Sequence, residues 1–119
     1  MTKILIVDDD PINLKLFSIL AEKNQWTYDT ADTGKKAQKL LQEKQYQLVL
    51  LDIQLPEIDG FTLLAQMRKD NIQSHVIAIT AHAMAGDKEK ILAKGADSYL
   101  PKPINTEELI AKIKKVLVP

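Results

Sequence analysis

Polar side chains that could carry out chemistry follow four short apolar runs of this sequence. They are Asp8, Asp9 and Asp10 after the first run, Asp52 after the second, Thr80 after the third and Lys102 shortly after the fourth. Carboxylates that lie close together repel one another, so their charged forms persist only beside a compensating cation. Lys102 would supply one positive charge, and a metal ion would supply more. The residue types therefore predict a metal-assisted site if the fold brings these side chains together.

A carboxylate in such a site can act as a nucleophile toward phosphorus. It forms an aspartyl phosphate when a metal and cationic groups stabilise the oxygens of the transferred group. We expect Asp52 to be that nucleophile because it stands alone after a central run. Asp9 would then ligate the metal directly, Asp8 would do so through water or as a second ligand, and Thr80 and Lys102 would each contact a phosphoryl oxygen. Carboxylates without a histidine cluster or a cysteine favour a hard ion, Mg²⁺ or Mn²⁺.

The elements that must position these residues alternate between strands and helices. Short β-branched and leucine-rich runs predict buried strands at Ile4 to Val7, Leu48 to Leu51 and Val76 to Ile79, with weaker candidates at Thr27 to Ala31 and Asp97 to Leu100. Segments with helical spacing follow, over roughly 12–23, 35–44, 61–69, 84–94 and 107–117. The boundary residues agree, because Asp10, Asp59 and Asn105 predict helix N-caps and Gly95 predicts a helix end.

Strict alternation of strands and helices predicts parallel strands joined by right-handed crossovers. The predicted fold class is α/β, a three-layer sandwich whose five-stranded parallel sheet has the flavodoxin-like order 2-1-3-4-5. In that order the first and third strands are neighbours, and ligands bind beyond the carboxyl ends of the strands, where the winding reverses. We therefore expect Asp8, Asp9 and Asp52 to meet in one crevice, flanked by Thr80 and Lys102.

Composition limits the classes of function. The 119 residues fit one domain, residues 1–119, with one moderate core. Sixteen basic residues balance sixteen acidic ones, so no strong field would hold nucleic acid or an acidic membrane surface directly. The absence of cysteine excludes disulfides and thiolate chemistry, and it fits a cytoplasmic protein. The first apolar run reaches Asp8 too soon for a signal peptide or a membrane span.

The ordered set of motifs resembles the receiver domains of bacterial two-component response regulators. The matching pieces span nearly the whole chain and read VDDDP at 7–11, LDIQLPEIDG at 51–60, ITA at 79–81 and YLPKP at 99–103. The stretch 80–87 is similar to receivers of hybrid sensor kinases and of single-domain regulators, which favours a phosphorelay. The resemblance implies a CheY-like fold and phosphorylation of Asp52 from a phosphohistidine.

The resemblance also implies roles that the residue types alone do not assign. The main-chain carbonyl of Gln54 would join the carboxylates around Mg²⁺, and the Lys102–Pro103 peptide would be cis. Thr80 and Tyr99 would form a switch pair, in which Thr80 moves to the phosphoryl group and Tyr99 turns inward behind it. The side chains of Gln54 and His82 would flank the path of the hydrolytic water and so tune the lifetime of the phosphoryl group.

Signalling by such a domain would be a population shift. Phosphorylation would favour a minor conformation with a changed face, formed by the helix expected over 84–94, the strand over 97–100 and the helix over 107–117. A downstream protein target would bind that face. A sensor histidine kinase or a histidine phosphotransfer protein would supply the phosphoryl group. We expect the domain to be a monomer or a weak dimer. A receiver is not an enzyme in the usual sense, although it can catalyse its own phosphorylation from small donors and its own dephosphorylation.

Three other readings compete with a phosphorylated receiver. A haloacid-dehalogenase-like phosphatase also uses an aspartyl nucleophile after its first strand, but Ile12 stands where a hydroxyl or valine is expected, and 119 residues leave no room for a cap domain. A flavodoxin-like flavin carrier needs a hydroxyl- or glycine-rich phosphate loop where this chain has three acids. A receiver that only acts as a scaffold is the third reading.

No DNA-binding module follows Pro119 in this chain, and the chain is also compatible with a piece of a longer protein.

Overall fold

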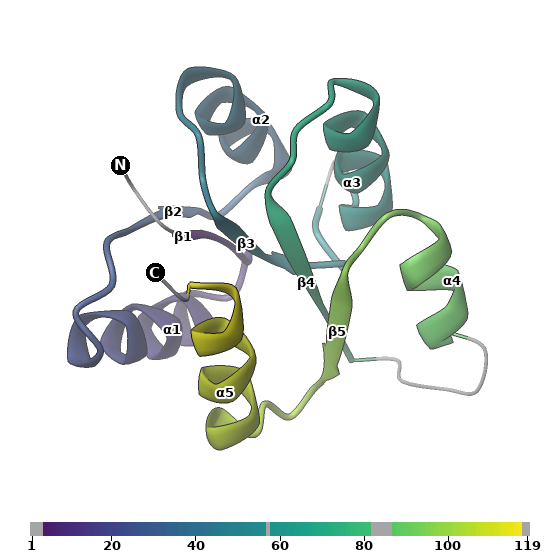
Figure 1. Ribbon diagram of the computed structural model, residues 1–119. Helices are drawn as coiled ribbons and strands as arrows, with labels where there is room; N and C mark the ends of the chain where they lie inside the picture. Colours follow the sequence, from purple (N-terminus) through teal and green to yellow (C-terminus); the bar gives the residue numbers. More distant parts are fainter. Residues whose placement is uncertain (1–3, 57, 82–86, 118–119) are drawn as a thin grey trace.

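The computed structural model describes residues 4–56, 58–81 and 87–117 and has the predicted α/β architecture (Figure 1). Five parallel strands form one sheet in the order β2-β1-β3-β4-β5. The strands are β1 (Ile4–Val7), β2 (Tyr28–Ala31), β3 (Leu48–Asp52), β4 (His75–Thr80) and β5 (Ser98–Pro101). The helices are α1 (Pro11–Lys23), α2 (Gly34–Glu43), α3 (Gly60–Lys69), α4 (Asp87–Ala93) and α5 (Thr106–Val116).

The sheet is covered by helices on both faces, with α1 and α5 on one side and α2, α3 and α4 on the other (Figure 1). Side chains of β1 divide between the two layers. Leu5 and Val7 pack into the cluster under α2, α3 and α4, whereas Ile4 and Ile6 pack into the cluster under α1 and α5. Each large aliphatic side chain buried in this way contributes about 1.5–3 kcal/mol to folding. Burial on both faces explains why the central strands are unbroken apolar runs.

Three predicted helix caps are present. The side-chain oxygens of Asp10, Asp59 and Asn105 accept hydrogen bonds from the backbone N–H groups of Ile12, Thr62 and Glu108. Gly95 ends the α4 segment with a φ of 116°, a left-handed conformation that favours glycine. These caps confirm that Asp10 and Asp59 have structural roles at the starts of α1 and α3.

The strand and helix boundaries other than those of α4 lie within one residue of the sequence-based expectation. The fifth strand begins at Ser98 and ends at Pro101, one residue later than predicted. Asp97 instead precedes the strand, and its carboxylate accepts a hydrogen bond from the backbone N–H of Val76. Helix α4 is described from Asp87 to Ala93, and Met84 in the predicted range 84–94 lies outside the described residues.

Arg68 joins three segments at the amino ends of β4 and β5. Its guanidinium donates to the carbonyl oxygens of Gly95, Ile72 and Ser74 and to the carboxylate of Asp97, over distances of 2.7–3.0 Å. Helix α3 is thereby tied to the loops that lead into the two strands. We refer to Arg68 and Asp97 as the basal clamp.

Within the described residues, none of the helices is both long enough and apolar enough to cross a lipid bilayer.

Candidate functional site

The carboxyl ends of four strands bring the predicted site residues together. Asp8 follows β1, Asp52 ends β3, Thr80 ends β4 and Lys102 follows β5. The strand register aligns these ends, because Val7 pairs with Leu51, Asp52 with Ile79 and Thr80 with Pro101. The parallel fold therefore converts four distant segments of sequence into one crevice.

Three carboxylates form the acidic part of this crevice. Oxygen atoms of Asp8, Asp9 and Asp52 all lie within 4.8 Å of one another. Asp8 and Asp52 are 0% and 1% exposed, whereas Asp9 is exposed. Hard divalent cations bind to oxygen ligands of this kind, and Mg²⁺ commonly keeps several waters beside one or two carboxylates. The donor set thus fits Mg²⁺, with Asp9 on the side open to solvent.

Asp8 is fixed by the start of α1. Its Oδ1 accepts from the backbone N–H of Asp10 at 2.9 Å, and its Oδ2 accepts from Nδ2 of Asn13 at 3.2 Å. Asn13 was not among the site residues predicted from the sequence. A usable signal was its position in the first turn of a helix that starts directly after a strand end, where a side chain can reach back to that strand.

Both carboxylate oxygens of Asp52 also have hydrogen-bond donors. Oδ1 accepts from the backbone N–H of Gln54 at 2.9 Å, and Oδ2 accepts from Nζ of Lys102 at 3.1 Å. The side chains of Lys102 and Asp52 are 24% and 2% exposed, so this ion pair is largely withdrawn from water. The two donors hold the carboxylate in one orientation at the centre of the site.

The electrostatics of the site are those of crowded acids beside one cation. Burial raises the pKa of Asp8 to about 6, the N–H of Asp10 opposes that rise, and the negative charge of Asp52 adds to it. Burial alone would lower the pKa of Lys102, but its hydrogen bond to Asp52 and the charges of Asp52, Asp8 and Asp9 raise it overall. The lysine therefore stays protonated, and the site favours an additional positive charge.

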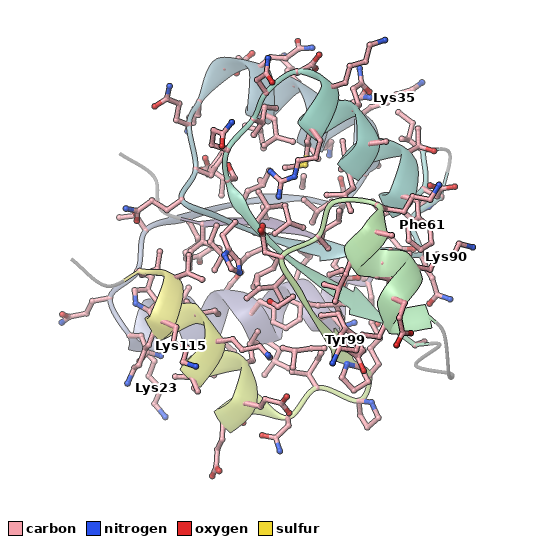
Figure 2. All side chains as sticks on the ribbon, turned by 45° about the vertical axis from the view of Figure 1, so that its right-hand side comes forward. Lys23, Lys35, Phe61, Lys90, Tyr99 and Lys115 are labelled. Atoms are coloured by element: carbon pink, nitrogen blue, oxygen red, sulfur yellow. The ribbon has the colours of Figure 1, made fainter. Side chains whose placement is uncertain are left out.

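The remaining predicted residues have different surroundings. Thr80 is buried, with 3% exposure, at the end of β4. Tyr99 is half-buried on β5 (Figure 2). Nζ of Lys88 lies 5.9 Å from the centre of the Tyr99 ring. Gln54 is exposed, and the Lys102–Pro103 peptide is cis, in agreement with the expectation. His82 lies outside the described residues.

This arrangement suits nucleophilic attack by a carboxylate on phosphorus. Asp52 has a fixed orientation, a lysine at one oxygen and a cluster of metal-binding oxygens beside it. Positively charged groups around a phosphoryl group stabilise the negative oxygens of the transition state. The phosphatase and flavin-carrier alternatives have less support. Of the three acids after β1, Asp8 and Asp9 belong to the carboxylate cluster and Asp10 caps α1.

Comparison with known proteins gives a consistent result. The family model for the response regulator receiver domain matches residues 4–114. The signal transduction histidine-protein kinase BarA of Escherichia coli is 42% identical over 109 residues, which are 89% of this chain and 12% of that protein. The polar-differentiation response regulator DivK of Brucella ovis is 39% identical over 120 residues, covering 98% of each chain. The chain thus spans about an eighth of the kinase and nearly all of the single-domain regulator.

Solved structures show the same fold. The receiver domain of the Francisella response regulator 1452 has a TM-score of 0.93 and 32% identity, covering 98% of this chain and 96% of that one. TrrA of Thermotoga maritima, solved in complex with Mg²⁺-BeF, has a TM-score of 0.86 and 34% identity, covering 98% and 100%. The Ssk1 receiver domain of Saccharomyces cerevisiae, solved with the histidine phosphotransfer protein Ypd1, has a TM-score of 0.88 and 30% identity, covering 98% and 92%.

Proposed function

This chain belongs to the response regulator receiver family of two-component systems, and from that membership we propose that Asp52 accepts a phosphoryl group from a phosphohistidine. The observation that carries the proposal is the position of the Asp52 carboxylate. It is buried at the centre of the crevice, oriented by Lys102 and Gln54, and adjacent to Asp8 and Asp9.

Mg²⁺ is the proposed cofactor, and Mn²⁺ is a candidate substitute. Asp8, Asp9 and Asp52 would hold the ion together with the main-chain carbonyl of Gln54. Support comes from the clustered carboxylate oxygens and from the Mg²⁺ in the related TrrA complex. When bound, the ion would neutralise negative charge on the phosphoryl oxygens.

The transfer step uses groups already in place. A carboxylate oxygen of Asp52 forms a bond to phosphorus while the bond from phosphorus to the histidine nitrogen breaks, and the electron pair leaves with the imidazole. Lys102 pairs with an oxygen of the transferred group, and the Thr80 hydroxyl donates a hydrogen bond to another. Because Lys102 stays protonated, it can provide this charge throughout the neutral pH range.

A sensor histidine kinase or a histidine phosphotransfer protein is the proposed donor. The related Ssk1 receiver, solved in complex with Ypd1, supports this class of partner. We take residues 1–119 as one cytoplasmic receiver domain, a monomer or weak dimer without direct nucleic-acid or membrane contacts. Phosphorylation from small donors and self-catalysed dephosphorylation, tuned by the side chains of Gln54 and His82, belong to the same proposal.

The output of the domain is proposed to be the face formed by α4, β5 and α5. A hollow of about 510 Å³ on this face is lined by Lys88, Leu92, Tyr99 and Lys112, among others. Tyr99 is half-buried there and can move inward once Thr80 moves toward the phosphoryl group. Such a movement would change the shape of the hollow that a downstream protein target contacts.

Phosphorylation by acetyl phosphate tests the acceptor assignment. With Mg²⁺, intact mass should show an adduct of about 80 Da, the mass of one phosphoryl group. The adduct should disappear with EDTA and in Asp52→Asn. Asp32→Asn is the matched control, because it makes the same chemical change at an exposed carboxylate paired with Lys36, and it should be phosphorylated like the native protein.

An adduct retained in Asp52→Asn would overturn the assignment of the acceptor. No adduct in the native protein, together with no binding of beryllofluoride, would favour the scaffold reading.

A further inference from the structure

A hollow of about 310 Å³ lies beside the candidate phosphorylation site, between the start of α3 and helix α4. Gln54 and Thr80 line it at the site, and Ile53, Phe61 and Ile91 provide apolar surface. Asp59 and Lys90 are its charged lining residues. A hollow of this size is at the lower end of the range for small-molecule pockets, which are mostly apolar with a few placed polar groups.

Phe61 and Lys90 approach each other across this hollow, which we call the α3–α4 cleft. Nζ of Lys90 lies 5.3 Å from the centre of the Phe61 ring, within the range of a cation–π contact. Figure 2 shows the two side chains close together, one from α3 and one from α4. Phe61 is half-buried against the core, so part of its ring remains available to a ligand.

We propose that the α3–α4 cleft binds the leaving group of small acyl phosphate donors, and that it favours an aromatic acyl group over acetyl. This inference rests on the proposed phosphorylation of Asp52. Thr80 and Gln54 belong both to the cleft and to the surroundings of Asp52, so a donor whose phosphorus is at Asp52 can extend its acyl group into the cleft. The Phe61 ring and two isoleucines suit a flat, apolar group such as benzoyl.

The reaction balances without a further reactant. A carboxylate oxygen of Asp52 forms a bond to phosphorus as the bond from phosphorus to the acyl oxygen breaks. The acyl oxygen leaves with the electron pair as a carboxylate, so no proton has to be supplied. Lys90 provides a positive charge that attracts this leaving carboxylate, and Phe61 contacts the group attached to it.

Phosphorylation rates with two donors test the inference. The native full chain is treated with acetyl phosphate and with benzoyl phosphate in Mg²⁺, and the phosphorylated fraction is followed by intact mass. Phe61→Ala should lower the ratio of the benzoyl rate to the acetyl rate by about tenfold, because it removes the apolar contact that only the larger group makes. Phe61→Leu keeps an apolar side chain at this position, so this variant should stay folded, and it should lower the ratio less than Phe61→Ala does.

Lys90→Met should slow both donors by a similar factor, since both release a carboxylate. Lys94→Met is its control, because it removes the same charge from an exposed position just after α4, and it should leave both rates unchanged. An unchanged ratio in both folded Phe61 variants would overturn the role of the cleft. Equal slowing by Lys90→Met and Lys94→Met would overturn the role of Lys90.

Benzoate binding separates this inference from the proposed function. In amide NMR spectra, benzoate should shift the resonances of Ile53, Gln54, Phe61 and Ile91 more than acetate does. If neither donor phosphorylates the native protein and beryllofluoride does not bind it, the proposed function fails whatever benzoate does. If both donors work and benzoate shifts none of these resonances, only the inference about the cleft fails.

Discussion

Asp8 shows how the crowding of acids affects a single residue. It is fully buried, and its raised pKa of about 6 reflects burial and the charge of Asp52. A carboxyl group whose pKa is higher in the folded state than in the unfolded state binds more protons when folded. Its favourable contribution is therefore complete below the unfolded pKa near 3.8 and is lost as pH rises through about 6. At neutral pH, Asp8 destabilises the metal-free protein.

Asp8→Asn should therefore stabilise the metal-free protein. In EDTA at pH 7.5 we expect its free energy of unfolding to be higher by about 1–2 kcal/mol, because the buried charge is gone. Urea titrations at pH 7.5 and at pH 4 measure the effect, and the gain should shrink at pH 4. Asp9→Asn is the control at the exposed neighbour and should change stability much less. A gain that is equal at both pH values would contradict the burial argument.

At the scale of elements, the basal clamp decides how α3 and two strands are held together. Arg68 is the donor to three carbonyl oxygens and to Asp97, and its side chain is 28% exposed. Removal of the guanidinium leaves carbonyl groups without this donor, and such a loss is costly in a partly buried place. The clamp lies at the strand ends opposite the site, so it should affect stability more than chemistry.

Arg68→Met should lower the free energy of unfolding by about 2–4 kcal/mol. Lys69→Met changes an exposed charge on the same helix and should stay within about 0.5 kcal/mol of the native protein. Urea unfolding compares the two variants, and acetyl phosphate labelling should proceed in both while they are folded. Equal stability of the two variants would show that the clamp contributes little.

Gly60 controls how closely α3 approaches the end of β3. A Cβ atom at this position would lie 2.5 Å from Cα of Ile53 and 2.8 Å from the carbonyl oxygen of Asp52. Backbone atoms cannot move aside as a flexible side chain can, so the helix start or the acceptor strand would have to shift.

Gly60→Ala is therefore expected to destabilise the protein by about 1–3 kcal/mol and to slow phosphorylation of Asp52. Thr62→Ala, an exposed change in the same helical turn, should do neither. Thermal unfolding and mass-detected phosphorylation provide the two readouts. Normal stability of Gly60→Ala would mean that the contact relaxes without strain.

These elements also show which structural features can be predicted from the sequence and which cannot. The central strands were predicted well because burial on both faces demands unbroken apolar runs, and the caps at Asp10, Asp59 and Asn105 follow from local chemistry. The start of β5 was misplaced by one residue because Asp97 is used as a tertiary anchor. Arg68 was missed because its partners in the loops before β4 and β5 come together only when the chain is folded. Asn13 was missed although its position in the first turn of α1 is a local signal.

At the scale of the whole molecule, Mg²⁺ should act as a ligand of the folded state. The clustered carboxylates come from β1 and β3 segments that meet only in the folded sheet, so the unfolded chain lacks the site. A ligand that binds only the folded state stabilises it by about 2.7 kcal/mol at a concentration one hundred times its dissociation constant.

The melting temperature should rise with the logarithm of Mg²⁺ concentration, by several degrees at saturation. The rise should be smaller at pH 5.5 than at pH 7.5, because below its pKa of about 6 a proton on Asp8 competes with the ion. Differential scanning fluorimetry at constant ionic strength measures this, and Asp9→Asn should reduce the rise. A rise that NaCl reproduces would contradict specific binding.

Lys102 and Asp52 pair across 50 residues of sequence. During synthesis, the acceptor carboxylate is therefore made well before the lysine that pairs with it. A ribosome that has completed the acceptor strand has produced the carboxylates but not yet the lysine. The nascent chain can therefore present its acids long before it can stabilise a transferred phosphoryl group. We therefore expect efficient labelling of Asp52 only after translation has passed Lys102 and β5 has joined the sheet.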